Sequence, residues 1–145
     1  MHPLPHRYPV TATTTADGSV AVRAPGLPEI VTAAPAEFGG PGDRWSPESL
    51  LVAAVADCFV LSFRAIARAS GLEWRDLHCT ATGVLDRVER VTQFTAVEVT
   101  AALTVPAGSD TAKAEKLLHK AEASCLVSNS LKAGCSLNTT VNVAD

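Results

Sequence analysis

The chain has 145 residues, of which 47% are hydrophobic and 19% are charged, and this composition is typical of a globular protein rather than a disordered or coiled-coil one. Its formal net charge of −3 at pH 7 gives no electrostatic support to a nucleic-acid partner. The longest uninterrupted apolar run, 50–56, is too short to span a membrane. The first ten residues, MHPLPHRYPV, lack the basic segment followed by an apolar segment that is typical of a signal peptide. We therefore expect a cytoplasmic protein without a membrane or nucleic-acid partner, and a single domain over residues 1–145.

The first part of the chain predicts short strands and a loop. Residues 10–24, VTATTTADGSVAVRA, carry Asp17-Gly18 between two runs rich in Thr and Val. This pattern predicts a β-hairpin with a tight turn. A further short strand is expected at 28–33, and the Gly/Pro-rich sequence AAPAEFGGPGDRWSP that follows predicts a loop.

A long helix is predicted from Pro47 to about Ser70. Ser46 suits the N-cap, proline is favoured at the first helical position, and Glu48 lies at the positive end of the helix dipole. Gly71 follows at the position where a glycine commonly ends a helix. The helix is apolar on nearly all sides over 50–63, which favours burial.

The second half of the chain predicts a hairpin, a helix, a short helical turn and a last strand. Two antiparallel strands are expected at 74–88 and 91–105, joined near Glu89 and Arg90. A helix capped by Asp110 is expected at 111–123. The short helical turn is expected at 128–134 and the last strand at 136–143. Strands, long helix, strands, helix and strand in this order predict an α+β fold rather than βαβ repeats.

The four cysteines are spread along the chain without C-x-x-C spacing. They are Cys58, Cys79, Cys125 and Cys135, with separations of 21, 46 and 10 residues. This spacing favours neither a zinc site nor the disulfide framework of a small secreted domain, so no metal and no cofactor is expected. The remaining alternatives are inert buried thiols and redox-active thiols. Cys79 and Cys135 we interpret as structural.

Glu48 and Cys58 fall in one stripe of the predicted long helix, together with Ser62. At about 1.5 Å of rise per residue they are roughly 15 Å apart, so direct contact is not expected. The carboxylate could instead hold a third group, such as an arginine, over the thiol. The alternative is that Glu48 only complements the helix dipole and Cys58 only fills the core, since cysteine is among the most buried residue types.

Two segments resemble the signatures of one family. GGPGDRWSPESLLVAAVADCF resembles three consecutive features of the OsmC/Ohr family of thiol-dependent hydroperoxide reductases. These are a Gly-rich loop, an Asn/Ser-Pro-Glu-x-Leu sequence and an Ala-rich helix that ends in a cysteine. AEASCLVSNSL resembles that family's second signature, Glu-x-x-Cys-Pro-x-Ser-x-x-Leu. The order of the elements between them also matches. The resemblance implies an OsmC-like fold, with antiparallel sheets packed on a long central helix in an intertwined homodimer.

The resemblance also implies a role for each matching residue. Cys58 would be the peroxidatic thiolate that attacks an organic hydroperoxide and becomes a sulfenic acid. Cys125 would be the resolving thiol that forms a disulfide with Cys58, and a dithiol reductant, either a lipoyl protein or a small thiol, would reduce that disulfide. Glu48 would orient an arginine that lowers the thiol pKa and stabilises the leaving alkoxide.

The chain departs from the family pattern in two places. The hairpin turn TTTADGSV has threonines where the Ohr branch has its arginine. Arg44 is the preferred candidate for the activating arginine, and Arg23, on the far side of the hairpin, is the second. Leu126 replaces the proline that follows the second cysteine, which is expected to loosen the turn there while leaving the thiol available.

Three functions are therefore compared. The first is a peroxidase of oxidative-stress defence that uses Cys58 and Cys125. The second is a non-catalytic, stress-associated or small-molecule-binding dimer that keeps the fold and lacks an activating arginine. The third treats all four cysteines as core residues. Two thiols in two matching motifs favour the first.

Overall fold

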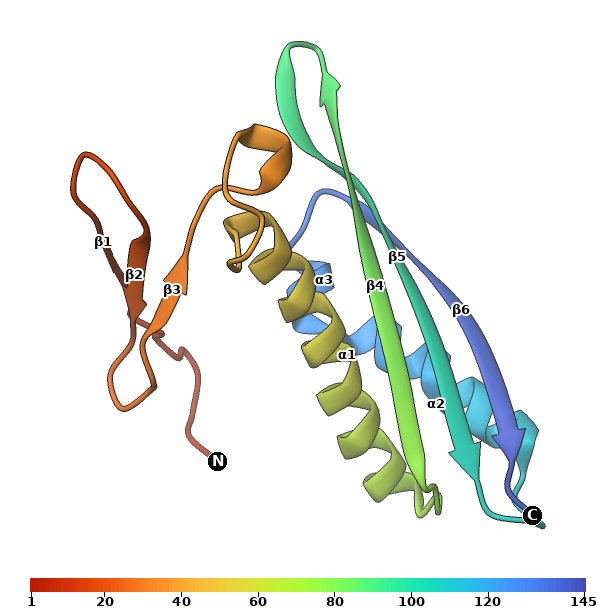
Figure 1. Cartoon of the computed structure of the whole chain (residues 1–145). Coiled ribbons are helices and arrows are strands. Elements are labelled where there is room, and N and C mark those ends of the chain that lie inside the picture. The colour runs from red at the N-terminus through yellow and green to blue at the C-terminus, as the bar shows by residue number, and fades with distance from the viewer. The chain divides into compact units, whose positions relative to one another are not determined.

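The computed structural model describes residues 1–145 and separates them into two compact units. The N-terminal unit comprises Met1–Leu50 and the C-terminal unit comprises Leu51–Asp145. Figure 1 labels the helices and strands of both units. The expected single domain over residues 1–145 stays a prediction.

The N-terminal unit contains a small antiparallel sheet in the order β1-β2-β3. Its strands are β1 (Thr11–Thr13), β2 (Val20–Arg23) and β3 (Ile30–Thr32). The predicted hairpin and third strand are therefore present, but the expected tight turn is wrong, because residues 14–19 form a wider loop. The Thr14 hydroxyl donates to the Ser19 carbonyl at 3.1 Å and the Thr15 hydroxyl to the Asp17 carbonyl at 2.7 Å, so side chains satisfy the backbone of this loop.

A Gly-rich loop follows β3, as predicted, and includes a short 3-10 turn at Ala36–Phe38. Within it, a Cβ added to Gly40 would stand 1.7 Å from the Ala34 carbonyl oxygen, so only glycine allows this close approach of two backbone segments. The loop returns beside β3, where the Ala33 N–H donates to the Trp45 carbonyl at 3.0 Å. The start of the long helix is thereby tied to the small sheet.

The long helix α1 spans Pro47–Ser70, as predicted. At its start the Ser49 N–H donates to the Ser46 hydroxyl at 3.1 Å and the Ser46 N–H donates to the Ser49 hydroxyl at 2.9 Å, a reciprocal cap. At its end Gly71 has a φ of 68°, the left-handed conformation that glycine tolerates.

By length and composition alone, α1 is also apolar enough to cross a membrane, which the short run at 50–56 did not predict. Core helices of globular proteins meet the same criterion, so the expectation of no membrane partner stays a prediction.

The C-terminal unit contains a three-stranded sheet in the order β4-β5-β6. β4 (Asp76–Val88) and β5 (Val91–Val105) form the predicted antiparallel hairpin, and Glu89 and Arg90 have the positive φ angles of its turn. β6 (Gly134–Val143) runs parallel to β5, so this sheet is mixed, whereas antiparallel sheets were expected. Two helices lie between β5 and β6 in the chain and carry it back to the opposite end of the sheet, the connection that parallel strands need.

Helix α2 (Thr111–Ser124) begins with the predicted cap, in which Asp110 accepts from the Lys113 N–H at 2.9 Å. The next helix, α3 (Leu126–Asn129), begins two residues before the predicted Ser128, because Cys125 ends α2 and caps α3 at once. β6 likewise begins at Gly134 rather than at 136. Both differences fall at element ends, where local patterns are least informative.

The apolar core lies in the C-terminal unit. One stripe of α1 contributes Val55, Phe59, Phe63 and Ala67, and the inward face of β5 and one face of α2 supply most of the rest. Figure 1 shows α1 and α2 beside the sheet formed by β4, β5 and β6. The structure is thus an α+β fold with a long central helix, one antiparallel sheet and one mixed sheet.

Candidate functional site

The C-terminal unit brings two of the predicted site residues together. Cys58 lies on α1, directly before the buried Phe59, and Cys125 lies at the junction of α2 and α3. Both are free thiols, and the Cys125 thiol is close enough to the Cys58 sulfur to favour its ionised form. The fold of the C-terminal unit therefore places two thiols, 67 residues apart in the sequence, next to each other.

Cys58 has the environment of a reactive thiol. Burial, the largest single influence, raises the pKa of Cys58, but hydrogen bonds outweigh it and the pKa lies below the ordinary value of 9.0. These hydrogen bonds come from the Val127 N–H, the Cys125 thiol, the Ser62 hydroxyl and the Leu126 N–H. Donors aimed at a sulfur stabilise its thiolate, so Cys58 ionises more readily than a free cysteine.

Two of these donors belong to the start of α3, where backbone N–H groups have no partner within the helix. The departure from the family pattern matters at this point. A proline at position 126 has no N–H, whereas Leu126 supplies one to the Cys58 sulfur. The loosened turn expected for Leu126 is replaced by a regular α3 that begins at this residue.

Ser62 is the third donor and lies one helical turn after Cys58, with its hydroxyl oxygen 3.9 Å from the sulfur. Its position in the stripe of Glu48 and Cys58 was visible in the sequence through the i, i+4 spacing. The contributions of Leu126 and Val127 were not, because they depend on how α3 packs against α1.

Cys125 has the opposite character. It is almost completely buried, and this burial raises its pKa above 9.0, with the nearby Cys58 adding to the increase. The Ser128 hydroxyl and N–H lower the pKa in part. Cys125 therefore keeps its proton under conditions in which Cys58 loses its own. The two neighbouring thiols therefore differ in acidity, and Cys58 is the more acidic of the pair.

The charged residues predicted for the site lie in the N-terminal unit or at the start of α1. One carboxylate oxygen of Glu48, Oε2, is shielded from solvent and has no hydrogen-bond partner. Neither candidate arginine forms an ion pair with Glu48. Arg23 instead pairs with Glu29. An unpartnered buried carboxylate oxygen is unfavourable, so Glu48 is poised to accept a donor.

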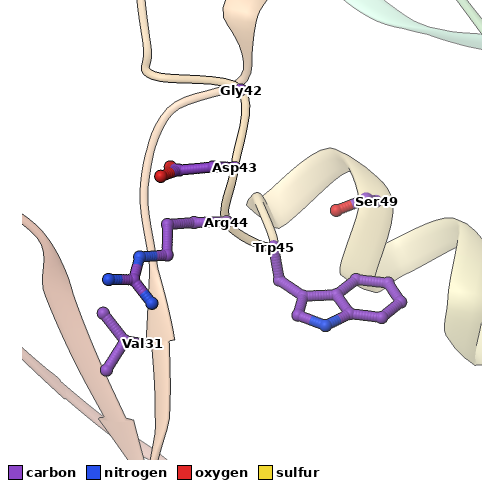
Figure 2. Close-up of a pocket in the computed structure, with 6 residues that line it drawn as sticks. All are labelled: Val31, Gly42, Asp43, Arg44, Trp45 and Ser49. Atoms are coloured by element: carbon purple, nitrogen blue, oxygen red, sulfur yellow. The ribbon is translucent and has the colours of Figure 1, made fainter.

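Arg44 lines an open pocket of about 420 Å³ in the N-terminal unit. The lining residues are Val31, Gly42, Asp43, Arg44, Trp45 and Ser49. In Figure 2 the guanidinium of Arg44 extends toward Val31, while the indole of Trp45 projects below the first turn of α1. The pocket combines a cation, a carboxylate and apolar surface without any ion pair to Arg44.

The other two cysteines lie near the pair as well. Cys79 on β4 and Cys135 on β6 both pack against the core, and the nearby Cys125 contributes to the raised pKa of each. Burial raises the pKa of both thiols. No group of three or more His, Cys, Asp or Glu side chains is arranged to hold a metal ion.

The model of the OsmC-like protein family matches residues 40–140 of this chain. The uncharacterized protein YmaD of Bacillus subtilis is 29% identical over 112 residues, which is 75% of each chain. Peroxiredoxin OsmC of Escherichia coli is 31% identical over 93 residues, just under two thirds of each chain at 64%.

An OsmC-like protein of unknown function from Vibrio cholerae has a similar solved structure, with a TM-score of 0.86 at 18% identity. That match covers 94% of this chain and all of the other, and it shows the fold. The family match covers well over half of the chain and contains Glu48, Cys58 and Cys125. The chain therefore belongs to the OsmC-like family.

Proposed function

We propose that the protein is a thiol-dependent peroxidase that reduces organic hydroperoxides to alcohols in oxidative-stress defence. The observation that carries the proposal is the pairing of Cys58, whose pKa is lowered, with Cys125, whose pKa is raised. The thiolate is the form of cysteine that attacks a peroxide. A neighbouring thiol that is still protonated can then react with the resulting sulfenic acid to form a disulfide. The relationship to peroxiredoxin OsmC supports the same chemistry.

The reaction proceeds in balanced steps. The Cys58 thiolate attacks the distal oxygen of the hydroperoxide, the O–O bond breaks, and the alkoxide leaves and takes a proton to become an alcohol. Cys58 is now a sulfenic acid. The Cys125 sulfur then attacks the Cys58 sulfur, a disulfide forms, and the hydroxyl leaves as water with the proton of Cys125.

A dithiol completes the cycle by thiol–disulfide exchange. It opens the Cys58–Cys125 disulfide through a mixed disulfide and leaves as its own disulfide, and both cysteines return as thiols. A lipoyl protein or a small thiol in the cytoplasm would serve as this reductant. Leu126 is 70% exposed at the start of α3, so the chain beside Cys125 is open to solvent there.

Glu48 and an arginine would assist the first step. The unpartnered Oε2 atom of Glu48 would accept hydrogen bonds from a guanidinium, and the guanidinium would stabilise the leaving alkoxide. Arg44 remains the first candidate because it forms no ion pair, whereas Arg23 is bound to Glu29.

The homodimer belongs to the proposal too. The N-terminal unit exposes apolar side chains on β3 and on the segments that flank its strands, among them Val10, Leu27 and Ile30, and Leu61 on α1 is 50% exposed. Exposed apolar surface of this kind marks an interface in many soluble proteins. A second copy of the chain would bury it. Analytical ultracentrifugation over a range of concentrations should give twice the mass of the chain, and a monomer throughout would contradict the dimer.

The direct test of the function is turnover. The purified protein with a dithiol should consume cumene hydroperoxide, and Cys58→Ser should show no turnover. Cys79→Ser is the matched control, because it removes a core-facing thiol that has no role in the proposed steps, and it should keep the activity. Wild-type turnover by Cys58→Ser would contradict the assignment. Absence of turnover in the wild type would favour the non-catalytic dimer instead.

A further inference from the structure

A third thiol lies beside the Cys58–Cys125 pair. Cys135 is the second residue of β6 and is in register with Val97 of β5, which is buried. Along β6 every second side chain is sheltered, beginning with Cys135, so its sulfur is on the core face of the sheet. Cys125, at the junction of α2 and α3, is buried as well, and it is close enough to Cys135 to contribute to the raised pKa of that thiol.

Ser128 connects the two sulfurs. Its hydroxyl donates to the Cys125 carbonyl at 3.1 Å, and its side chain is close enough to both thiols to lower in part the pKa of each. Ser128 is buried, so packing holds this side chain beside both thiols. The charge of Cys125 also contributes to the raised pKa of Cys135, which places the two cysteines near each other.

Cys135 is better placed than Cys79 to move toward Cys125. Cys79 lies within β4, where the ladder to β5 continues on both sides of it. Cys135 lies at the start of β6 and follows residues 130–133, which belong to neither a helix nor a strand. A disulfide needs Cα atoms within about 7 Å, and a short irregular segment next to one cysteine allows such an adjustment.

We propose that Cys135 is a third redox-active thiol. It replaces Cys58 as the disulfide partner of Cys125, so that Cys58 becomes a free thiolate while Cys125 stays in a disulfide. The proposal rests on the peroxidase function proposed above, because that reaction supplies the Cys58–Cys125 disulfide. It changes the interpretation of Cys135 from a structural residue to a participant in the redox cycle.

The transfer is a thiol–disulfide exchange and needs no further oxidant. Cys135 loses its proton to solvent, and its thiolate attacks the Cys125 sulfur of the Cys58–Cys125 disulfide. The Cys125–Cys135 bond forms, the Cys58–Cys125 bond breaks, and the electron pair leaves on Cys58 as a thiolate. The number of disulfides in the chain is unchanged.

The direction of transfer follows from the acidities of the thiols. The pKa of Cys58 lies below the ordinary value, so Cys58 is a good leaving group in exchange. Burial raises the pKa of Cys135, with a further increase from Glu122, so this sulfur is more stable in a disulfide than as a thiolate. Both effects favour the Cys125–Cys135 disulfide with Cys58 ionised.

The consequence is a second oxidation of the same chain before any reductant acts. Once Cys58 is free it attacks another hydroperoxide, and with Cys125 already in a disulfide its sulfenic acid persists. The wild type should therefore consume about two equivalents of hydroperoxide per chain. A chain that keeps the Cys58–Cys125 disulfide should consume about one equivalent.

The experiment treats the reduced full-length protein with one equivalent of cumene hydroperoxide, then with a second equivalent and dimedone, which traps sulfenic acids. Disulfides and adducts are mapped by peptide mass spectrometry. The wild type should carry a Cys125–Cys135 disulfide and a dimedone adduct on Cys58 of the same chain. Cys135→Ser should stop after one equivalent, with a Cys58–Cys125 disulfide and no adduct, whereas Cys79→Ser should behave as the wild type.

The outcomes separate the two proposals. A wild-type chain that stays at the Cys58–Cys125 disulfide overturns the role of Cys135 and leaves the peroxidase function intact. The same holds if Cys79→Ser, rather than Cys135→Ser, prevents the second oxidation. A Cys58 that is never oxidised overturns the peroxidase function itself. Mapping of the wild type gives this answer even if Cys135→Ser does not fold.

Discussion

The two units of the chain differ in what holds them together. Every buried hydrophobic residue belongs to the C-terminal unit, whereas the buried residues of the N-terminal unit are Thr32 and Ser46, both polar. The C-terminal unit has an apolar core, and the N-terminal unit relies on a small sheet and on loop hydrogen bonds.

The residues predicted for the site are distributed over the two units in the same way. Cys58 and Cys125 belong to the unit with the core, where Cys125 and the start of α3 lie beside Cys58. Arg44 and Glu48 belong to the unit without one. All hydrogen-bond donors that lower the pKa of Cys58 belong to its own unit. The lowered pKa of this thiol therefore does not require a group from the N-terminal unit. The predictions below test this contrast.

The largest expected effect comes from the core. Phe63 is fully buried, so Phe63→Ala should lower the free energy of unfolding by about 3–5 kcal/mol through lost contacts and a cavity. The matched control is Phe38→Ala in the N-terminal unit, where the ring is 60% exposed and the expected change is less than about 0.5 kcal/mol. Urea denaturation measures both. Equal losses would contradict the contrast between the units.

A smaller loss of stability is expected at Gly83 on β4. A Cβ at this position would lie 2.6 Å from a Val52 methyl group and 2.7 Å from the Phe94 ring, so Gly83→Ala should cost about 1–3 kcal/mol through overpacking. Gly134→Ala is the control, because nothing lies within 4 Å of the added atom. Addition of Val52→Ala should recover part of the loss in thermal unfolding, and no recovery would contradict the proposed clash.

A change at Ser62 should act on reactivity rather than on stability. The Ser62 hydroxyl lowers the pKa of Cys58, so Ser62→Ala should raise it and slow alkylation of Cys58 at neutral pH. One hydrogen bond is worth at most about tenfold in this rate. Ser62→Thr, which keeps the hydroxyl, should retain most of the rate. An unchanged rate in Ser62→Ala would show that this hydroxyl does not stabilise the thiolate.

The smallest expected effect is at Leu126, because its N–H is the weakest of the donors that lower the pKa of Cys58. Leu126→Pro removes this N–H while suiting the first position of α3. The pKa of Cys58 should therefore rise with little change in thermal unfolding. Leu126→Ala keeps the N–H and should leave the pKa unchanged, so a similar rise in both variants would contradict the role of the backbone donor.

The fold was predictable where local signals agree. α1 has a capping serine, a proline and a terminal glycine at the expected places, and α2 has its aspartate cap. The parallel pairing of β6 was not predictable, because it depends on the path of α2 and α3 rather than on the sequence of the strand. The wide loop at 14–19 was missed because threonine hydroxyls replaced the usual turn hydrogen bonds.

The site was predictable only in part. Helical spacing placed Ser62 on the side of Cys58, but the proximity of Cys125 came from resemblance to a family and not from spacing. The N–H groups of Leu126 and Val127 reach Cys58 through the packing of α3, which no local pattern describes. The effect of Ser128 on Cys135 was not predictable for the same reason, because the two residues belong to different elements.

The central claim is that Cys58 is the acidic thiol of the pair and Cys125 the protonated one. The direct measurement is the rate of iodoacetamide alkylation of each cysteine against pH, resolved by peptide mass spectrometry. Because only the thiolate reacts, each rate rises with pH and levels off above the pKa. The midpoint for Cys58 should lie below 9.0 and that for Cys125 above it. A Cys58 midpoint at or above that of Cys125 would contradict the account.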